Sequence, residues 1–349
     1  MSTTGRRSAL STALWVRLGE ATNRTFVLPV VIFFPTSLCN SRCVSCDWWK
    51  ASGDTDLSLA EIQALAGALP ALGTRIVAFS GGEPLLRPEV FDAARIFRAE
   101  GMTLHLLTSG VLLERCAADV AHEFSRVVVS LDATTEALYQ TVRGIAALTI
   151  VERGVARLRR LAPGIPVTAR ATLHRLNFRE LPRLIDHARA MALDGISFLP
   201  ADVSSSAFGR SESRPVAALA LDASEIAELD SLVEQTIADH RDDFESGFVA
   251  ETPEKLRRLG RHYAALAGEE AFPPVVCNAP YTSGVVEADG SVRPCFFHEP
   301  VGNIRRASLG SIVDKNLPAF RRGLDIGSNP ICRRCVCSMR TGWRNAPWQ

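Results

Sequence analysis

Segments typical of β-strands alternate with segments typical of α-helices over about half of this chain, and the alternation limits the folds open to it. The strand-like segments are apolar and rich in β-branched residues, as parallel strands buried on both faces are. They are residues 26–34, 75–79, 103–108, 126–131, 166–174 and 195–199. The amphipathic segments between them are residues 58–69, 88–100, 113–123, 135–142, 148–161 and 178–192. This order predicts a parallel α/β architecture, with too few units for a closed eight-stranded barrel.

Three cysteines lie within eight residues just after the first strand-like segment, in the sequence Cys39-Asn-Ser-Arg-Cys43-Val-Ser-Cys46. So short a loop can wrap three thiolates around one compact group, and thiolates prefer zinc, copper(I) or iron–sulfur clusters. Three ligands are one fewer than a closed structural zinc site needs. They suit a cubane cluster that leaves one iron open to a ligand from outside the protein. A zinc knuckle is the alternative.

A second motif, Ser80-Gly81-Gly82-Glu83-Pro84, directly follows the second strand-like segment. Glycines let a backbone approach a ligand closely. Glu83 adds a carboxylate at the carboxyl end of a strand, where barrel enzymes build their active sites. An ordinary strand-to-helix turn is the alternative.

The C-terminal region carries a second group of cysteines, which are Cys277, Cys295, Cys332, Cys335 and Cys337. The Asp289-Gly290 pair between two strand-like stretches predicts a β-hairpin, which would bring Cys277 and Cys295 together. Cys332 and Cys335 would complete a set of four thiolates, with Cys337 either replacing Cys335 or standing as a spare thiol. Four cysteines suit an iron–sulfur cluster or a zinc ion.

The cysteine spacing of the first loop, followed by Gly-Gly-Glu-Pro, resembles the signature of radical S-adenosylmethionine (radical SAM) enzymes. The C-terminal cysteines, with Gly290 five residues before Cys295, resemble a twitch domain, the shortened form of the SPASM domain. The resemblance implies a partial (β/α)6 barrel with a small C-terminal domain of β-hairpin and helices. It also implies a 4Fe–4S cluster that binds S-adenosylmethionine on the first three cysteines, and one auxiliary 4Fe–4S cluster on Cys277, Cys295, Cys332 and Cys335.

The same resemblance implies which residues hold S-adenosylmethionine: Gly81, Gly82, Glu83, Ser130, Asp132 and Arg143. An arginine can bind a carboxylate through two hydrogen bonds, and the alternative for Asp132 is the cap of a helix that begins near Thr134. Catalytic residues are not identified by the sequence, and the candidates are Arg170, His174, His298 and Glu299. A core or surface role is the alternative for each of these four.

Four regions are expected along the chain: an N-terminal amphipathic helix in residues 1–24, the barrel in 25–205, a linker and helices in 206–272, and the auxiliary-cluster domain in 273–349. The polar stretch 202–215 is read as a linker or a mobile loop. The net charge of +1 gives no basic footprint for nucleic acid. No apolar run is long enough to span a membrane and no signal peptide is recognised, so we expect a cytoplasmic protein.

The expected activity is cleavage of S-adenosylmethionine to a 5′-deoxyadenosyl radical, which takes a hydrogen atom from a small molecule such as a sugar, aminocyclitol or nucleoside. Too few residues precede the first strand for a folded leader-binding domain, which favours a small substrate over a peptide. The product would belong to natural-product or antibiotic biosynthesis, made by an oxidoreductase or lyase with flavodoxin or ferredoxin as electron donor. The alternatives are modification of a peptide or protein, and a metal-binding protein without enzymatic activity.

Overall fold

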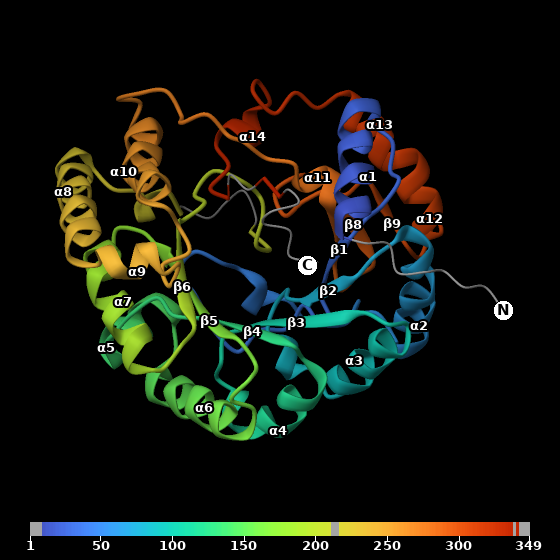
Figure 1. The fold of residues 1–349 in the computed structure, drawn as a ribbon, viewed down its shortest axis with the longest axis horizontal. Helices are drawn as coiled ribbons and strands as arrows, with labels where there is room; N and C mark the ends of the chain where they lie inside the picture. The colour runs from blue at the N-terminus through green and yellow to red at the C-terminus, as the bar shows by residue number, and fades with distance from the viewer. Residues whose placement is uncertain (1–8, 211–215, 338–339, 342–349) are drawn as a thin grey trace.

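The computed structural model describes residues 9–210, 216–337 and 340–341 (Figure 1). Within these ranges, one curved sheet has the strand order β6-β5-β4-β3-β2-β1-β7-β8-β9. Its first six strands run parallel to one another in sequence order, so the predicted partial (β/α)6 barrel is confirmed. These strands are β1 (Val30–Phe33), β2 (Ile76–Phe79), β3 (Thr103–Thr108), β4 (Arg126–Ser130), β5 (Val167–Leu173) and β6 (Gly195–Pro200).

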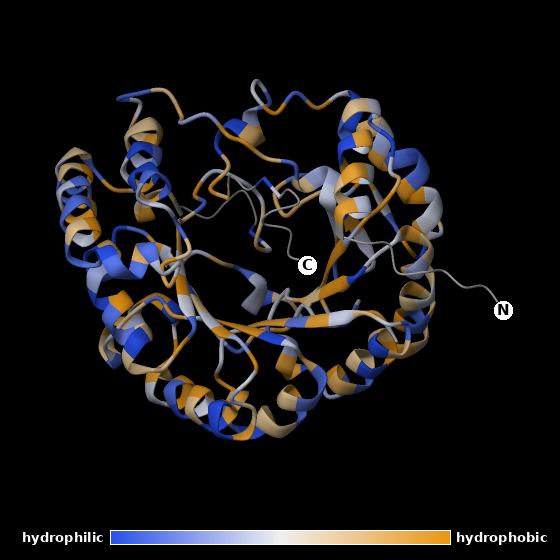
Figure 2. Ribbon diagram, viewed as in Figure 1, coloured by the Kyte–Doolittle hydropathy of each residue, from blue (hydrophilic) through white to orange (hydrophobic). Residues whose placement is uncertain are grey.

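Helices cover the outer face of this sheet (Figure 1), and their ribbons carry both hydrophobic and hydrophilic residues (Figure 2). The buried apolar residues of the helices form one core with those of the strands. In chain order they are α2 (Leu59–Ala68), α3 (Val90–Ala99), α4 (Leu113–Glu123), α5 (Glu136–Arg143), α6 (Leu148–Leu161), α7 (Leu181–Ala190), α8 (Ala223–Asp239), α9 (Arg241–Glu245) and α10 (Pro253–Ala267). A capping box forms at the start of α2, where Ser58 and Glu61 cap each other's backbone N–H groups. Helix α1 (Ala9–Thr22) precedes the barrel, and no described helix is long and apolar enough to cross a membrane.

Short helical turns join these elements. Those of the 3₁₀ type are Trp48–Lys50, Pro70–Leu72, Pro84–Leu86, Phe178–Glu180 and Val216–Leu219, and a π-helical turn spans Ile312–Asn316. Part of the stretch 202–215, predicted as a linker or a mobile loop, is well packed. Arg210 forms a buried ion pair with Asp202 and donates to the carbonyl of Ala207. Residues 211–215 of that predicted linker lie outside the described residues.

The C-terminal hairpin predicted at Asp289-Gly290 is present, and it extends the barrel sheet. Strand β7 (Ser283–Val286) pairs in parallel with β1, and β8 (Ser291–Arg293) and β9 (Gly302–Asn303) follow in antiparallel order. The pairing supplies hydrogen-bond partners to an edge of β1 that would otherwise stay open. The helices of this region are α11 (Ala279–Thr282), α12 (Leu309–Ser311), α13 (Leu317–Arg322) and α14 (Pro330–Arg333).

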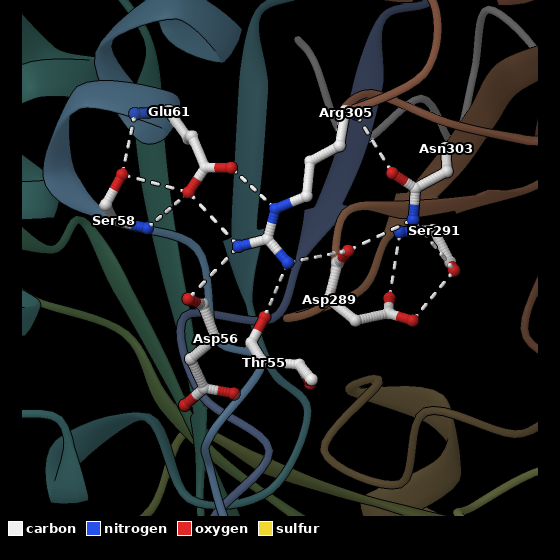
Figure 3. Close-up of polar contacts among 8 residues, drawn as sticks. All are labelled: Thr55, Asp56, Ser58, Glu61, Asp289, Ser291, Asn303 and Arg305. Carbon is white, nitrogen blue, oxygen red and sulfur yellow. Dashed lines mark hydrogen bonds and ion pairs between the residues drawn. The ribbon is translucent and has the colours of Figure 1, made fainter.

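Arg305, just after β9, fastens the C-terminal region to the barrel (Figure 3). Its Nη2 donates to Glu61 Oε2 at 3.1 Å, and its Nη1 donates to the carbonyl of Thr55 at 3.0 Å. The neighbouring Asp56 accepts hydrogen bonds from Thr36 Oγ1 and from the backbone N–H of Ser37. Arg305 therefore supports, through the 55–56 segment, the residues that lead directly into the first cysteine loop.

Candidate active site

The first cysteine loop lies at the carboxyl end of β1, between the end of α5 and the segment around Phe208. Backbone N–H groups of Arg42 and Val44 donate to the last turn of α5, at 2.8 and 3.0 Å. On the other side, Asp47 N donates to the carbonyl of Phe208 at 2.9 Å, and Cys46 Sγ lies 3.5 Å from the same oxygen. The loop is thus anchored on both sides, which keeps its three cysteines together.

The three thiols of this loop are close enough to influence one another's charge. Burial, and after it the neighbouring Cys43, raises the pKa of Cys39 to about 11 and that of Cys46 to about 12. Arg143 acts in the opposite direction on both thiols. Metal ligation requires deprotonated cysteines. Three partly buried, mutually repelling thiolates therefore suit a strongly cationic iron centre, and the residues present fit the expected cluster.

Gly81 and Gly82 pass directly over the segment that leads into the cysteine loop. Gly81 has φ of +103°, and a Cβ at Gly82 would lie 2.0 Å from the carbonyl oxygen of Leu38. The backbone N–H of Glu83 donates to that same oxygen at 2.7 Å. These glycines are therefore required here for packing the motif against the cysteine loop, and the close approach to a ligand that the sequence suggested stays a prediction.

The carboxylate of Glu83 turns into the barrel wall. It is fully buried and accepts hydrogen bonds from Leu85 N at 3.1 Å, Thr108 Oγ1 at 2.7 Å and Ser109 N at 2.6 Å. These contacts join the second motif to the end of β3, and Ser109 Oγ lies 3.3 Å from Asn40 Oδ1 in the cysteine loop. The predicted contact between this carboxylate and the cofactor stays a prediction, and the observed contacts give Glu83 a positioning role.

Asp132 and Arg143 form a buried ion pair beside the cysteine loop. Asp132 Oδ2 accepts from Arg143 Nη1 at 2.9 Å, and its Oδ1 accepts from Thr172 N at 2.7 Å. The alternative role of Asp132 as a helix cap is wrong, because Thr135 caps α5. Burial opposes the charge of Arg143, but Cys43, Tyr139 and Asp132 leave its pKa well above the usual value. Ser130 ends β4 close by, in register with Arg170.

Four members of the second group of cysteines share one pocket. Its lining residues include Cys277, Cys295, Cys332 and Cys335. Burial, with a contribution from the neighbouring thiols of the set, raises the pKa of Cys295 to about 11 and that of Cys332 to about 12. The hairpin and the turn after α14 therefore bring together the four cysteines that the sequence predicted as one ligand set.

Cys337 does not line this pocket. Its sulfur interacts with Cys335, and this contact and burial raise the pKa of Cys337 well above its usual value, against the opposing charge of the nearby Arg170. Among the described residues, no three His, Cys, Asp or Glu side chains are grouped as ligands of a single metal ion. Two observations support a cluster at the second site: its four cysteines line one pocket, and their thiols raise one another's pKa.

The structure brings two of the four catalytic candidates near the site. Arg170 projects from β5 with its Nε 3.1 Å from Ser197 Oγ, and His298 Nε2 lies 3.2 Å from Cys332 Sγ. His174 is buried in the turn after β5, where its Nδ1 accepts from a backbone N–H, and burial lowers its pKa to about 4. The side chain of Glu299 is 74% exposed. The acid–base assignments stay predictions.

A group of ionisable residues near β6 was not predicted from the sequence. Glu251 is buried, accepts from Phe198 N at 2.8 Å and has a pKa raised by burial. Lys255 and Arg258 lie on the first turns of α10 and line a pocket with Cys335. Their sequence signal is an ordinary amphipathic helix, so only the packing of α10 against β6 indicates a role.

Comparisons with known proteins match both halves of this site. Residues 33–188 match the family model of the radical SAM superfamily, and residues 277–336 match that of SPASM, an iron–sulfur cluster-binding domain. Fe-coproporphyrin III synthase of Methanosarcina barkeri is 30% identical over 305 residues, which are 81% of this chain and 73% of that protein. PqqA peptide cyclase of Rhodopseudomonas palustris is 31% identical over 175 residues, 49% of this chain and 46% of that protein, so the match spans less than half of that relative.

A solved structure has the same fold. The crystal structure of Streptococcus suis SuiB bound to its precursor peptide SuiA superposes with a TM-score of 0.64 at 14% sequence identity, covering 93% of this chain and 75% of SuiB. The likeness extends over the barrel and the C-terminal region together.

Proposed function

The chain belongs to the radical SAM superfamily, and from this premise we propose that it is an enzyme that modifies a peptide or a protein. It holds a 4Fe–4S cluster that binds S-adenosylmethionine and an auxiliary iron–sulfur cluster. The iron–sulfur assignment of the SPASM match favours a cluster over a zinc ion on the C-terminal cysteines. When bound, the S-adenosylmethionine and its cluster supply a 5′-deoxyadenosyl radical that removes a hydrogen atom from the substrate.

We assign the ligands from the two groups of cysteines. Cys39, Cys43 and Cys46 hold the first cluster, and the set Cys277, Cys295, Cys332 and Cys335 holds the auxiliary cluster. The support is the anchored loop in the first case and the shared pocket in the second. Around the first cluster, Arg143 stabilises the thiolates with its charge, and Glu83 fixes the backbone of the glycine motif.

The proposal of a peptide substrate is supported by the match to a PqqA peptide cyclase, whose name states the substrate. It favours the peptide over the sugar, aminocyclitol or nucleoside that the sequence analysis put first. The fold agrees with this choice, since the SuiB structure shows that a barrel followed by such a C-terminal region can receive a peptide.

A second candidate is a carboxylate-bearing tetrapyrrole. The observation that favours it is the match to Fe-coproporphyrin III synthase, which extends over 81% of this chain. Coproporphyrins carry several propionate groups, so a tetrapyrrole substrate would present carboxylates to the enzyme, as an acidic peptide would.

The test uses the protein with both clusters reconstituted under anaerobic conditions, S-adenosylmethionine and a chemical reductant. Peptides encoded beside the gene and coproporphyrin III are supplied separately, and mass spectrometry follows 5′-deoxyadenosine and the mass of each substrate. We expect a peptide to raise the rate of 5′-deoxyadenosine formation and to change its own mass. A change in coproporphyrin alone would replace the first proposal by the second.

A further inference from the structure

A second pocket lies between the end of β6, helix α10 and the turn after α14. Phe198, Leu199 and Pro200 bring to it the carboxyl end of β6, which is the end of a barrel sheet where active sites form. Cys335 also lines it, so the pocket adjoins the auxiliary-cluster site. It is therefore placed to hold part of a substrate that reaches the active site.

The charged side chains that line this pocket are cations. They are Lys255, Arg258 and Arg333, and no acidic residue belongs to the described lining. His262 also lines it, but burial lowers its pKa to about 4, so the ring is neutral near pH 7. Like charges gathered in a partly desolvated pocket repel one another, and an anion among them relieves that repulsion.

The acids nearby leave much of this charge uncompensated. Glu251 Oε1 lies 3.9 Å from Lys255 Nζ, and burial raises the pKa of Glu251. Arg258 donates from Nη1 to the carbonyl of Pro274 at 2.8 Å, which is a neutral acceptor. An arginine has five N–H donors, so this contact leaves Arg258 able to bind a carboxylate.

We propose that this pocket binds a carboxylate of the substrate through Arg258, Arg333 and Lys255. The inference rests on the proposed function for the identity of the substrate, and it adds the chemical group by which the substrate is held. The carboxylate belongs either to an acidic segment of a peptide or to a tetrapyrrole propionate. A different role for the cations is to neutralise the auxiliary cluster, because burial lowers the pKa of Arg258 and Cys335 acts against that lowering.

The experiment measures binding by titration calorimetry to the protein with both clusters in place. The probes are hexaglutamate, coproporphyrin III and hexaserine as the uncharged reference. The variants are Arg258→Gln and Arg333→Gln, and each has a control one residue away. Arg257→Gln removes a cation that pairs with Glu234 on the outer side of α10, and Arg334→Gln removes one that adjoins Cys335 but does not line the pocket.

We expect an acidic probe to bind and hexaserine not to bind. Each pocket variant should weaken that binding roughly 10-fold or more, as loss of a charge-assisted hydrogen bond does. The controls should remain within about 2-fold of the unaltered protein, since the charges they remove are screened by solvent. Binding of hexaglutamate alone would identify a peptide, and binding of coproporphyrin alone would identify a tetrapyrrole.

The proposal is overturned if neither acidic probe binds, or if the pocket variants bind as well as their controls. It is also overturned if Arg258→Gln changes the reduction potential of the auxiliary cluster but leaves probe binding intact, because the cations would then serve the cluster. These results are independent of the proposed function, which is tested by the mass change of the substrate. An enzyme that modifies a peptide yet ignores both acidic probes would keep its function and lose this pocket assignment.

Discussion

Arg143 donates a hydrogen bond from Nη1 to Oδ2 of Asp132 over 2.9 Å, and both side chains are buried at the carboxyl end of the barrel. The backbone carbonyl of Arg143 also accepts from Arg42 N in the cysteine loop. This one residue therefore links the end of β4, the end of α5 and the loop that holds the first three cysteines.

Replacing Arg143 by glutamine should destabilise the protein by about 3–5 kcal/mol, because it leaves the carboxylate of Asp132 buried without its partner. It should also weaken S-adenosylmethionine binding roughly 10- to 150-fold. Urea unfolding and equilibrium binding measure the two effects. Arg42→Gln is the control, since its side chain is exposed. If adding Asp132→Asn to Arg143→Gln recovers no stability, the ion pair does not explain the loss.

Replacing Cys39, Cys43 and Cys46 together by alanine should remove about half of the iron, from about eight atoms to about four per chain, because two cubane clusters are expected. Cleavage of S-adenosylmethionine should stop. Iron analysis and chromatography of 5′-deoxyadenosine measure both results. Cys116→Ala is the matched control, since Cys116 lies on α4 and belongs to neither group of cysteines. Continued formation of 5′-deoxyadenosine by the triple variant would refute the assignment.

Glu83→Gln should lower the free energy of unfolding by about 1–3 kcal/mol, because an amide NH2 group would face donors that now hydrogen-bond to a carboxylate. The donors are Leu85 N, Thr108 Oγ1 and Ser109 N. Glu228→Gln is the control, as the Glu228 side chain is 46% exposed and pairs with Arg179, which is 53% exposed. Equal stability of the two variants, measured by urea unfolding, would show that the buried contacts of Glu83 contribute little.

The sequence predicted the barrel well because its signals are local. Residues 103–108 and 113–123 form β3 and α4 as predicted, since a buried parallel strand and an amphipathic helix each have their own periodicity. The first strand is shorter than the predicted 26–34, because pairing with β2 begins only at Val30, one residue after a proline.

Contacts between distant parts of the chain were not predictable in this way. The pairing of β7 with β1 and the clamp from Arg305 to Glu61 join residues about 250 positions apart, and neither leaves a periodic signal. The hydrogen bond that the buried carboxylate of Glu83 accepts from Ser109 N likewise depends on where β3 ends. The cysteines were predictable as ligands because their spacing is itself the signal, whereas the cationic pocket beside Cys335 exists only once α10 packs on β6.

The contact between Arg305 and Glu61 predicts that the free energy of unfolding depends on pH in the acid range. Arg305, together with Ser58, lowers the pKa of Glu61 from 4.5 to about 2. A carboxyl group whose pKa is lower in the folded state stabilises the fold fully above its unfolded value, and this contribution is lost as the pH falls toward the folded value. The stability difference between the unaltered protein and Glu61→Gln should therefore be constant above about pH 4.5 and shrink below it. Urea unfolding of the cluster-free protein measures it, and Glu114→Gln is the surface control.

The last prediction separates Cys335 from Cys337. Cys335 lines the pocket shared by Cys277, Cys295 and Cys332, and Cys337 does not. Cys335→Ala should therefore lose about half of the iron, and Cys337→Ala should keep all of it. The first variant should still cleave S-adenosylmethionine, because the cluster that does so lies on the other group of cysteines.

Product formation then tests what the auxiliary cluster does. Removal of one hydrogen atom leaves a substrate radical, and a net two-electron oxidation must pass one more electron to an acceptor, for which the auxiliary cluster is suited. If it serves as that acceptor, Cys335→Ala should make 5′-deoxyadenosine but stall before product, and the normal product should be two hydrogens lighter than the substrate. Full turnover by Cys335→Ala would exclude the acceptor role. Loss of iron from Cys337→Ala in place of Cys335→Ala would reassign the fourth ligand to Cys337, whose sulfur already lies against that of Cys335.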